Sequence, residues 1–256
     1  MYKIEIKAYL CSFEIEVNDI PSFWYFDEPQ IATDIPINSL IFSSGRQNVK
    51  FRIYPLYNNL TLHKDSKIEI NVFVKEANDF YLKKEIIASY KIKDSMQNKV
   101  FFEDIVNFSA NIPYTLDFSK INYDFSDGDE DKIATELYSH YVMLSNSIIN
   151  SDLKKYNEYT KIRFNDFATS HYLNEDRKKY FSDKALLAYK DYQLSLIPKE
   201  QYTLNFCCNY KLVYMSKPKD ALGIILEDKI SKQEKLHFVE SAIFFKNNSG
   251  ELQLFR

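Results

Sequence analysis

Glycine and proline are scarce in this 256-residue chain, which holds four glycines and seven prolines. Their usual combined share is about 12 % of residues, far above the share here. Glycine-rich loops that cradle phosphates need several closely spaced glycines, so nucleotide sites of that kind are nearly excluded. The Gly-x-Ser-x-Gly motif of α/β-hydrolases is also absent from the sequence, which leaves nucleophilic catalysis of that type unsupported.

Cysteine is almost as rare, and two of the three cysteines, Cys207 and Cys208, are adjacent. With Cys11 they form no disulfide framework, and such a count is typical of a reducing compartment. The four histidines are scattered, at positions 63, 140, 171 and 237. Zinc sites need several such ligands at close spacing. We therefore expect neither a metal site nor a cofactor.

Long apolar runs and excess basic charge are missing too. No apolar run approaches the 18 or so residues that a membrane-spanning helix needs. The first seven residues alternate charged with apolar side chains, so we expect no signal peptide. The formal net charge is −3 and the pI about 5.9, whereas domains that bind duplexes are usually basic. These features predict a cytoplasmic protein with neither a membrane nor a nucleic acid as partner.

Aromatic residues are abundant, at 16 % of the chain, with 20 tyrosines and 20 phenylalanines. The hydrophobic share of 45 % and the charged share of 27 % are ordinary for a globular protein. A chain of this length can bury a substantial core as one large or two modest domains.

Residues 1–120 show the period of two that is typical of half-buried strands. Apolar and polar residues alternate in four segments, at 2–10, 13–17, 49–53 and 68–74, and residues 86–90 are a further strand candidate. Pro55 ends the third segment, and other turn residues separate the rest. Several short strands without a helical period predict an antiparallel β-sandwich over residues 1–120.

Residues 121–132 are acidic and form the predicted linker between two domains. A calcium-binding EF-hand with Gly128 at its sixth position would place Tyr123, Phe125 and Ala134 where oxygen ligands are required, so that motif fails. The acids are typical of a solvated linker and of a helix start, where negative charge is favourable. They are also candidates for contact with a basic partner protein: Asp127, Asp129, Glu130 and Asp131.

Helical spacing begins at residue 133. Apolar side chains follow a 4-4-3-4 pattern from Ile133 to Ile148, which predicts a first helix. Asp152 is expected to cap a second helix over 153–171, and Asn174 a third, with Ser182-Asp183 either bending it or capping a fourth. Pro198 ends the helical region.

The last 55 residues return to a period of two. Every even position from 202 to 214 is apolar or aromatic, which predicts one long strand with a buried even face. Further strands are expected at 221–226, 236–245 and 252–255. Helices followed by strands place residues 133–256 in a second domain and the whole chain in the α+β class.

The order of these elements resembles the cone-shaped NTF2-like fold, and residues 141–156 resemble the opening helices of that superfamily. Enzymes with this fold place an Asp/His pair and tyrosines inside the cone. The resemblance therefore implies a catalytic alternative built from His171, Asp166, Tyr141 and Tyr210, although a single histidine on an apolar helical face is more often a core residue. Segments 17–21, 37–41 and 44–53 resemble jelly-roll-type sandwich domains, which implies sugar binding or scaffolding.

A mildly acidic, aromatic-rich α+β chain without a catalytic motif resembles the immunity proteins of bacterial toxin systems, several of which use NTF2-like folds. The resemblance implies a protein-binding module that neutralises a cognate toxin by direct contact, and we favour this non-enzymatic role. Two alternatives stay open: a small-molecule binder or enzyme that uses the cone cavity, and a sugar-binding or scaffold protein built on the sandwich.

Overall fold

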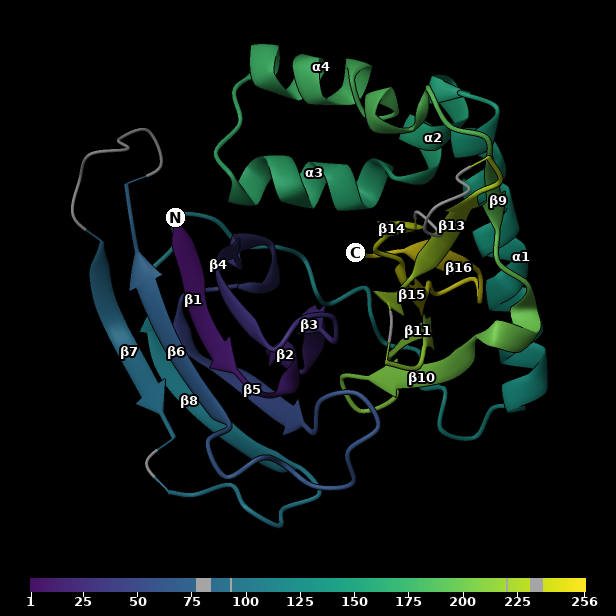
Figure 1. Ribbon diagram of the computed structural model, residues 1–256. Coiled ribbons are helices and arrows are strands. Elements are labelled where there is room, and N and C mark those ends of the chain that lie inside the picture. Colours follow the sequence, from purple (N-terminus) through teal and green to yellow (C-terminus); the bar gives the residue numbers. More distant parts are fainter. Residues whose placement is uncertain (77–83, 93, 220, 231–236) are drawn as a thin grey trace. The chain divides into compact units, whose positions relative to one another are not determined.

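The chain divides into two compact units in the computed structural model, which describes residues 1–76, 84–92, 94–219, 221–230 and 237–256 (Figure 1). The first unit comprises residues Met1–Asp117 with Ser170–Tyr172, and the second comprises Phe118–Thr169 with Leu173–Arg256. Residues 121–132 lie in the second unit. Antiparallel sheets and helices are both present, so the predicted α+β class is confirmed.

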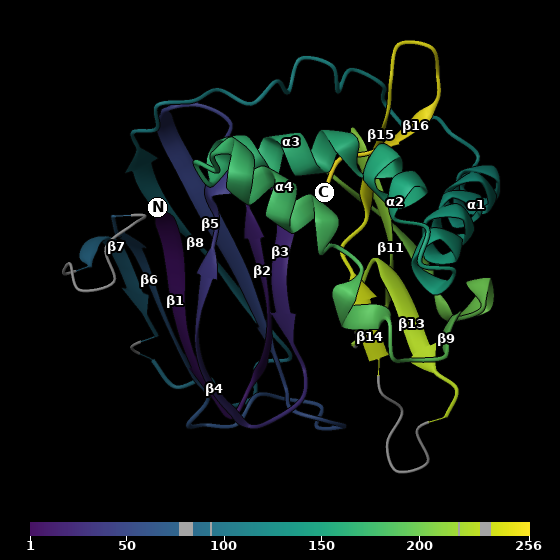
Figure 2. The ribbon, with the colours of Figure 1, turned by 90° about the horizontal axis from the view of Figure 1, so that it is seen from above.

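The first unit is a sandwich of two four-stranded antiparallel sheets, seen as two layers in Figure 2. One sheet has the order β4-β1-β6-β7, with β4 (Gln30–Pro36), β1 (Tyr2–Tyr9), β6 (Lys67–Val74) and β7 (Glu85–Lys91). The other has the order β3-β2-β5-β8, with β3 (Ile20–Tyr25), β2 (Ser12–Val17), β5 (Gly45–Tyr54) and β8 (Phe102–Ala110). A short 3₁₀ helix, η1 (Asn38–Leu40), lies between β4 and β5. The predicted sandwich is confirmed.

Alternation along the strands produces the core of this sandwich. Ile4 and Ile6 of β1 are fully buried, as are Val49 and Ile53 of β5, while their neighbours in sequence are partly open to water. Successive side chains of a strand point to opposite faces of the sheet, so a period of two builds one apolar face and one polar face.

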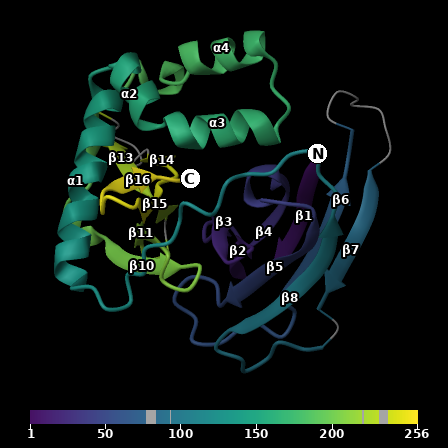
Figure 3. The same ribbon diagram turned by 180° about the vertical axis from the view of Figure 1, so that it is seen from behind.

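The second unit begins with four helices, visible from the opposite side in Figure 3: α1 (Glu130–Ile149), α2 (Leu153–Tyr159), α3 (Lys161–Ser170) and α4 (Glu175–Asp183). Side chains of Asp129, Asp152 and Asn174 accept backbone N–H bonds at the starts of α1, α2 and α4. The sequence predicts the caps of α2 and α4, whereas it predicts Asp129 only as an acid of the helix start. Among the described residues, no helix combines the length and the apolar character that crossing a bilayer requires.

The predicted helix over 153–171 is wrong in one respect, because it breaks into α2 and α3 at Thr160. The Thr160 hydroxyl bonds the Tyr156 carbonyl at 2.8 Å, and such local bonding by a β-branched residue competes with regular helix. Ser182-Asp183 caps no further α-helix, since α4 ends at Asp183 and only the 3₁₀ helix η2 (Leu187–Tyr189) follows.

The strands of the second unit form two antiparallel sheets. One has the order β10-β11-β15-β16 with β12 beside β11, and the other has the order β14-β13-β9. Helices thus precede strands, as expected, although the strands are shared between two sheets. Leu236, at the start of one predicted strand, lies outside the described residues. The element bounds are β9 (Leu194–Leu196), η3 (Lys199–Gln201), β10 (Thr203–Cys207), β11 (Leu212–Lys217), β12 (Ala221–Leu222), β13 (Ile224–Asp228), β14 (His237–Glu240), β15 (Ile243–Lys246) and β16 (Leu252–Leu254).

The predicted single strand over 202–214 is wrong, because the chain reverses in a hairpin between β10 and β11. Cys208, Asn209 and Tyr210 have φ angles of 52°, 52° and 60°, which place the turn in the left-handed region. Phe206 then pairs with Val213, so the face that is even in β10 is odd in β11. The alternation alone did not reveal this, because apolar residues also occupy the turn.

Burying a charge at position 213 distinguishes the hairpin from a continuous strand. Val213 is fully buried, so we expect Val213→Asp to destabilise the second unit by about 3 kcal/mol or more, since it buries an unpaired carboxylate. Thr203→Asp at the exposed end of β10 is the control and should cost far less. Urea unfolding followed by helical circular dichroism measures both. A mild effect at position 213 would contradict the hairpin.

Candidate functional site

The acidic segment is anchored to the second unit by two buried apolar residues. Ile121 and Phe125 are 1 % and 2 % exposed, and the Phe125 N–H donates to the Tyr210 carbonyl at 2.9 Å. The Gly128 N–H closes a turn on the Phe125 carbonyl at 3.0 Å. A Cβ at Gly128 would lie 2.6 Å from Cδ1 of Ile133 and 3.1 Å from the Phe125 carbonyl oxygen, so a larger residue there would require the Ile133 side chain to shift. The segment is therefore a fastened turn that leads into α1.

The four predicted partner-binding acids differ in what they do. Asp129 caps α1 and pairs with Lys132 at 3.1 Å, and hydrogen bonds from the Lys132 side chain and backbone lower its pKa. Asp127, Glu130 and Asp131 are exposed, and their carboxylates form no ion pair within the described residues. Three of the four acids are thus open to a partner, while the fourth holds the helix start.

Two exposed tyrosines are connected to the acidic segment, since Tyr123 belongs to it and the Tyr210 carbonyl accepts from the Phe125 N–H. Tyr123 and Tyr210 are 41 % and 49 % exposed. Tyr123 contacts Phe125 with ring centroids 4.9 Å apart, Phe125 contacts Phe206 at 6.1 Å, and Phe206 contacts Tyr210 at 5.2 Å. A continuous row of rings therefore supports both tyrosines from the core. We name the following set the acidic–tyrosine surface: Tyr123, Asp127, Asp129, Glu130, Asp131 and Tyr210.

A cavity of about 380 Å³ borders this surface. Its lining mixes the charged side chains of Glu130, Asp131, Lys199 and Glu200 with Ala134, Tyr202, Leu204 and Met215. The start of α1 thus borders a recess whose lining is partly charged and partly apolar.

The four residues of the catalytic alternative each make different contacts. The Tyr141 hydroxyl is fully buried, accepts from the Met215 N–H at 2.9 Å and donates to the Ala242 carbonyl at 3.0 Å. Burial raises the pKa of Tyr141. It fastens α1 to the strands behind it.

Asp166, on α3, forms an ion pair with Arg256 at 2.9 Å. His171 follows the end of α3, where its Nδ1 lies 3.1 Å from the Ser170 hydroxyl. Tyr210 belongs to the turn between β10 and β11 and to the acidic–tyrosine surface. Tyr141 and Asp166 are therefore engaged in structural contacts, and Tyr210 faces water.

Sequence reasoning missed a buried ion pair centred on Glu240 of β14. Its carboxylate accepts from the Tyr156 hydroxyl at 2.9 Å and from the Tyr189 hydroxyl at 2.8 Å, and it pairs with the Arg163 guanidinium. Arg163 also donates to the Ser241 carbonyl at 2.7 Å. The side chains of Arg163 and Glu240 are only 19 % and 13 % exposed. The network joins α2, α3 and η2 to β14.

Electrostatics explains why this carboxylate stays charged. Burial acts to raise the pKa of Glu240, but Arg163 and the hydrogen bonds from Tyr189 and Tyr156 outweigh it, so the pKa is lowered. Burial and the charge of Glu240 raise the pKa of both tyrosines. No signal in the sequence marks Glu240, because a single glutamate in a predicted strand is usually an exposed residue.

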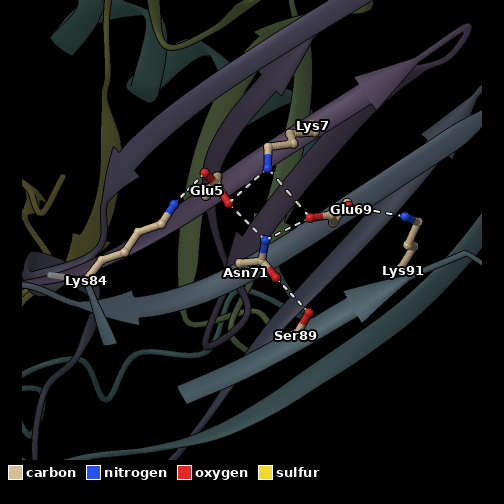
Figure 4. A network of polar contacts seen from close by, with 7 residues as sticks. All are labelled: Glu5, Lys7, Glu69, Asn71, Lys84, Ser89 and Lys91. Atoms are coloured by element: carbon tan, nitrogen blue, oxygen red, sulfur yellow. Dashed lines mark hydrogen bonds and ion pairs between the residues drawn. The ribbon is translucent and has the colours of Figure 1, made fainter. Parts of the chain in front are cut away.

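A second polar network lies on the outer face of the sandwich and is shown in Figure 4. Asn71 is its centre: its Nδ2 donates to Glu5 at 2.9 Å and to Glu69 at 3.1 Å, and its Oδ1 accepts from Ser89 at 2.6 Å. Glu5, Asn71 and Ser89 face one another across β1, β6 and β7. Three lysines complete the charges: Lys84 lies 2.6 Å from Glu5, Lys7 lies 3.4 Å from Glu5, and Lys91 lies 3.6 Å from Glu69.

The polar side chains of this second network are hydrogen-bonded to one another, so we interpret the network as cross-strand stabilisation of the sheet. The hydrogen bonds from Lys84 and Asn71 lower the pKa of Glu5 to about 2. Within the described part of the chain, no group of three His, Cys, Asp or Glu side chains is arranged to hold a metal ion.

No protein family, curated protein or solved structure matches this chain. The function is therefore argued from the surfaces and contacts of the molecule itself.

Removing one partner of the Glu240 network should be costly. We expect Arg163→Met to destabilise the second unit by about 3–5 kcal/mol, because it leaves a buried carboxylate without its cation. The same substitution at exposed Lys161, also on α3, is the matched control. Adding Glu240→Leu to Arg163→Met should recover much of the loss, since no charge is then buried alone. Urea unfolding followed by helical circular dichroism tests this, and equal effects at 163 and 161 would contradict it.

The sandwich should lose stability in acid through Glu5. Its folded-state pKa is about 2, against an ordinary value of 4.5 for glutamate, so its contribution to stability is present above pH 4.5 and is lost as the pH falls toward 2. Trp24 is the only tryptophan and lies in the first unit, so its fluorescence reports unfolding there. The stability difference between wild type and Glu5→Gln should shrink over that pH range. The exposed-site variant Glu85→Gln should show no such pH-dependent difference.

Proposed function

We propose that this chain is a protein-binding module, an immunity protein that neutralises a cognate bacterial toxin in the cytoplasm by direct binding. The observation that carries the proposal is the acidic–tyrosine surface, in which the fastened turn with its open carboxylates is hydrogen-bonded to the β10–β11 turn that holds the exposed Tyr210. Its partner would be a protein with a basic contact surface.

The two tyrosines have the features of interface anchors. Tyrosine offers a large contact area with a polar tip, and residues of this type contribute much of the binding energy in protein interfaces. Phe125 and Phe206 support Tyr123 and Tyr210 from behind. Anchors held in place before binding lose less conformational entropy when the complex forms.

The open carboxylates have a different part in the proposal. Asp127, Glu130 and Asp131 lie within five residues of one another at the start of α1. A concentrated negative charge attracts a basic partner over about 8–10 Å at ordinary ionic strength, which raises the association rate more than the affinity. In this proposal the acids increase the association rate, and the tyrosines slow dissociation of the complex.

The first test is whether the partner exists. The probe is the product of the open reading frame that neighbours the gene for this chain, produced with and without this chain in the same cell. We expect the product alone to arrest growth and the pair to grow, with the two proteins co-purifying. Growth arrest that this chain leaves unchanged, or a harmless product, would overturn the proposal.

Charge neutralisation should then slow association. For Asp127→Asn, Glu130→Gln and Asp131→Asn together, we expect the rate constant for association to fall several-fold at low salt, and the difference to shrink as salt screens the charges. Asp129 is kept because it caps α1. The matched control neutralises three exposed acids of the first unit: Asp27→Asn, Glu28→Gln and Asp65→Asn. Surface plasmon resonance measures both. If both triple variants slowed association equally, the net charge of the chain, and not the acidic–tyrosine surface, would account for the effect.

Truncating a tyrosine should affect dissociation instead. We expect Tyr210→Ala to raise the dissociation rate about 10-fold or more, with little change in association, because an anchor side chain costs about 2 kcal/mol when removed. Tyr180→Ala removes a tyrosine that is 60 % exposed on α4, outside the surface, and is the control. Unchanged dissociation in Tyr210→Ala and Tyr123→Ala would place the interface elsewhere.

A further inference from the structure

A groove of about 570 Å³ lies between α1 and α2 in the second unit and belongs to neither network nor the acidic–tyrosine surface. Its volume falls in the range of about 300–1,000 Å³ that is usual for sites of small molecules. Helix α1 supplies one wall and α2 with its cap residue supplies the other. The lining residues are Met143, Asn146, Ser147, Asn150, Asp152, Lys155, Glu158 and Tyr159.

One aromatic wall of the groove is fixed in position. The Tyr159 hydroxyl is hydrogen-bonded to Nδ1 of His140, whose ring also contacts Phe244 edge to face, with centroids 5.5 Å apart. Burial lowers the pKa of His140, which keeps the ring neutral and able to accept at Nδ1. The contact with His140 therefore holds the Tyr159 ring at a set orientation in the groove lining.

Several polar groups of the groove have no partner in the part of the chain that the structure describes. Within the described residues, the side chains of Asn146, Asn150 and Glu158 form no hydrogen bond or ion pair. Asp152 is engaged, because it caps α2 and pairs with Lys155 at 3.5 Å. Asn146 and Asn150 stand one helical turn apart on α1, so both amides face the same side.

The groove therefore combines two amides, each with donors and an acceptor, with a carboxylate that only accepts. Tyr159 and Met143 add apolar surface beside them. Its charge disfavours an anionic ligand, because Asp152 and Glu158 outnumber the one lysine, which Asp152 already holds. Hydroxyl groups that both donate and accept match this set of partners best.

We propose that the α1–α2 groove binds a neutral polyhydroxylated ligand, a sugar unit, with its hydroxyls on Asn146, Asn150 and Glu158 and a carbon face against Tyr159. Such a site is distinct from the acidic–tyrosine surface and from the Glu240 network. It gives the chain a small-molecule function independent of toxin binding.

The test is a chemical-shift titration of the full-length ¹⁵N-labelled chain. The probes are glucose, galactose, mannose and N-acetylglucosamine, with inorganic phosphate and putrescine as anionic and cationic comparisons. We expect at least one sugar to shift resonances of residues 143–159 saturably at millimolar concentration, with phosphate and putrescine weaker. No saturable shift with any sugar, shifts centred elsewhere, or stronger binding of phosphate or putrescine would each overturn the proposal.

Matched variants locate the site. Asn150→Ala and Glu158→Gln change exposed side chains that form no hydrogen bond or ion pair among the described residues, so the fold should survive, and each should weaken sugar binding at least several-fold. Lys154→Ala, an exposed change on α2 outside the groove lining, should bind as wild type does. Equal binding in all three variants would exclude this groove. The neutralised acidic–tyrosine variant should keep sugar binding, which separates this proposal from the toxin-binding one.

Discussion

The packing of the short helices of the second unit depends on one interaction, the pairing of the buried Glu240 carboxylate. A charge removed from water is tolerated only where an opposite charge and hydrogen bonds replace its hydration. Here the replacements come from three segments, since Tyr156, Arg163 and Tyr189 belong to α2, α3 and η2. The carboxylate can be satisfied only when all three segments are in place on β14. It therefore makes the docking of short helices, which are weak on their own, conditional on one another.

The parts of the fold that follow from local periodicity could be predicted from the sequence. The alternation around Ile4 and Val49 gives the sandwich, and Asp152 and Asn174 give helix starts, because caps and strand faces depend on neighbouring residues only. The hairpin at 208–211 was missed, since apolar side chains in a turn imitate a continuing strand. The break at Thr160 was missed as well, because the apolar spacing continues across it from Tyr156 to Phe164.

The candidate sites, like the fold, could be predicted from the sequence only in part. The acids of the turn stand out in the sequence, but the sequence does not show which of them make contacts. Only the structure shows that the Asp129 carboxylate caps α1 and that the Asp127 carboxylate is exposed to water. Tyr123 and Tyr210 are 87 positions apart in the sequence and are connected through the rings of Phe125 and Phe206 between them. The Glu240 network and the α1–α2 groove depend on contacts between distant segments, which no local pattern encodes.

The dual position of Asp129 has a consequence for how recognition can evolve. Its side chain closes the first turn of α1, so a change that alters the charge there also removes a helix cap, at a typical cost of about 1 kcal/mol. Asp127, Glu130 and Asp131 have no such duty in the described structure. If partners diversify, sequence drift should concentrate at those three positions, while position 129 keeps a short capping side chain. Related chains with different partners would then share one invariant acid or its capping equivalent, surrounded by a variable set.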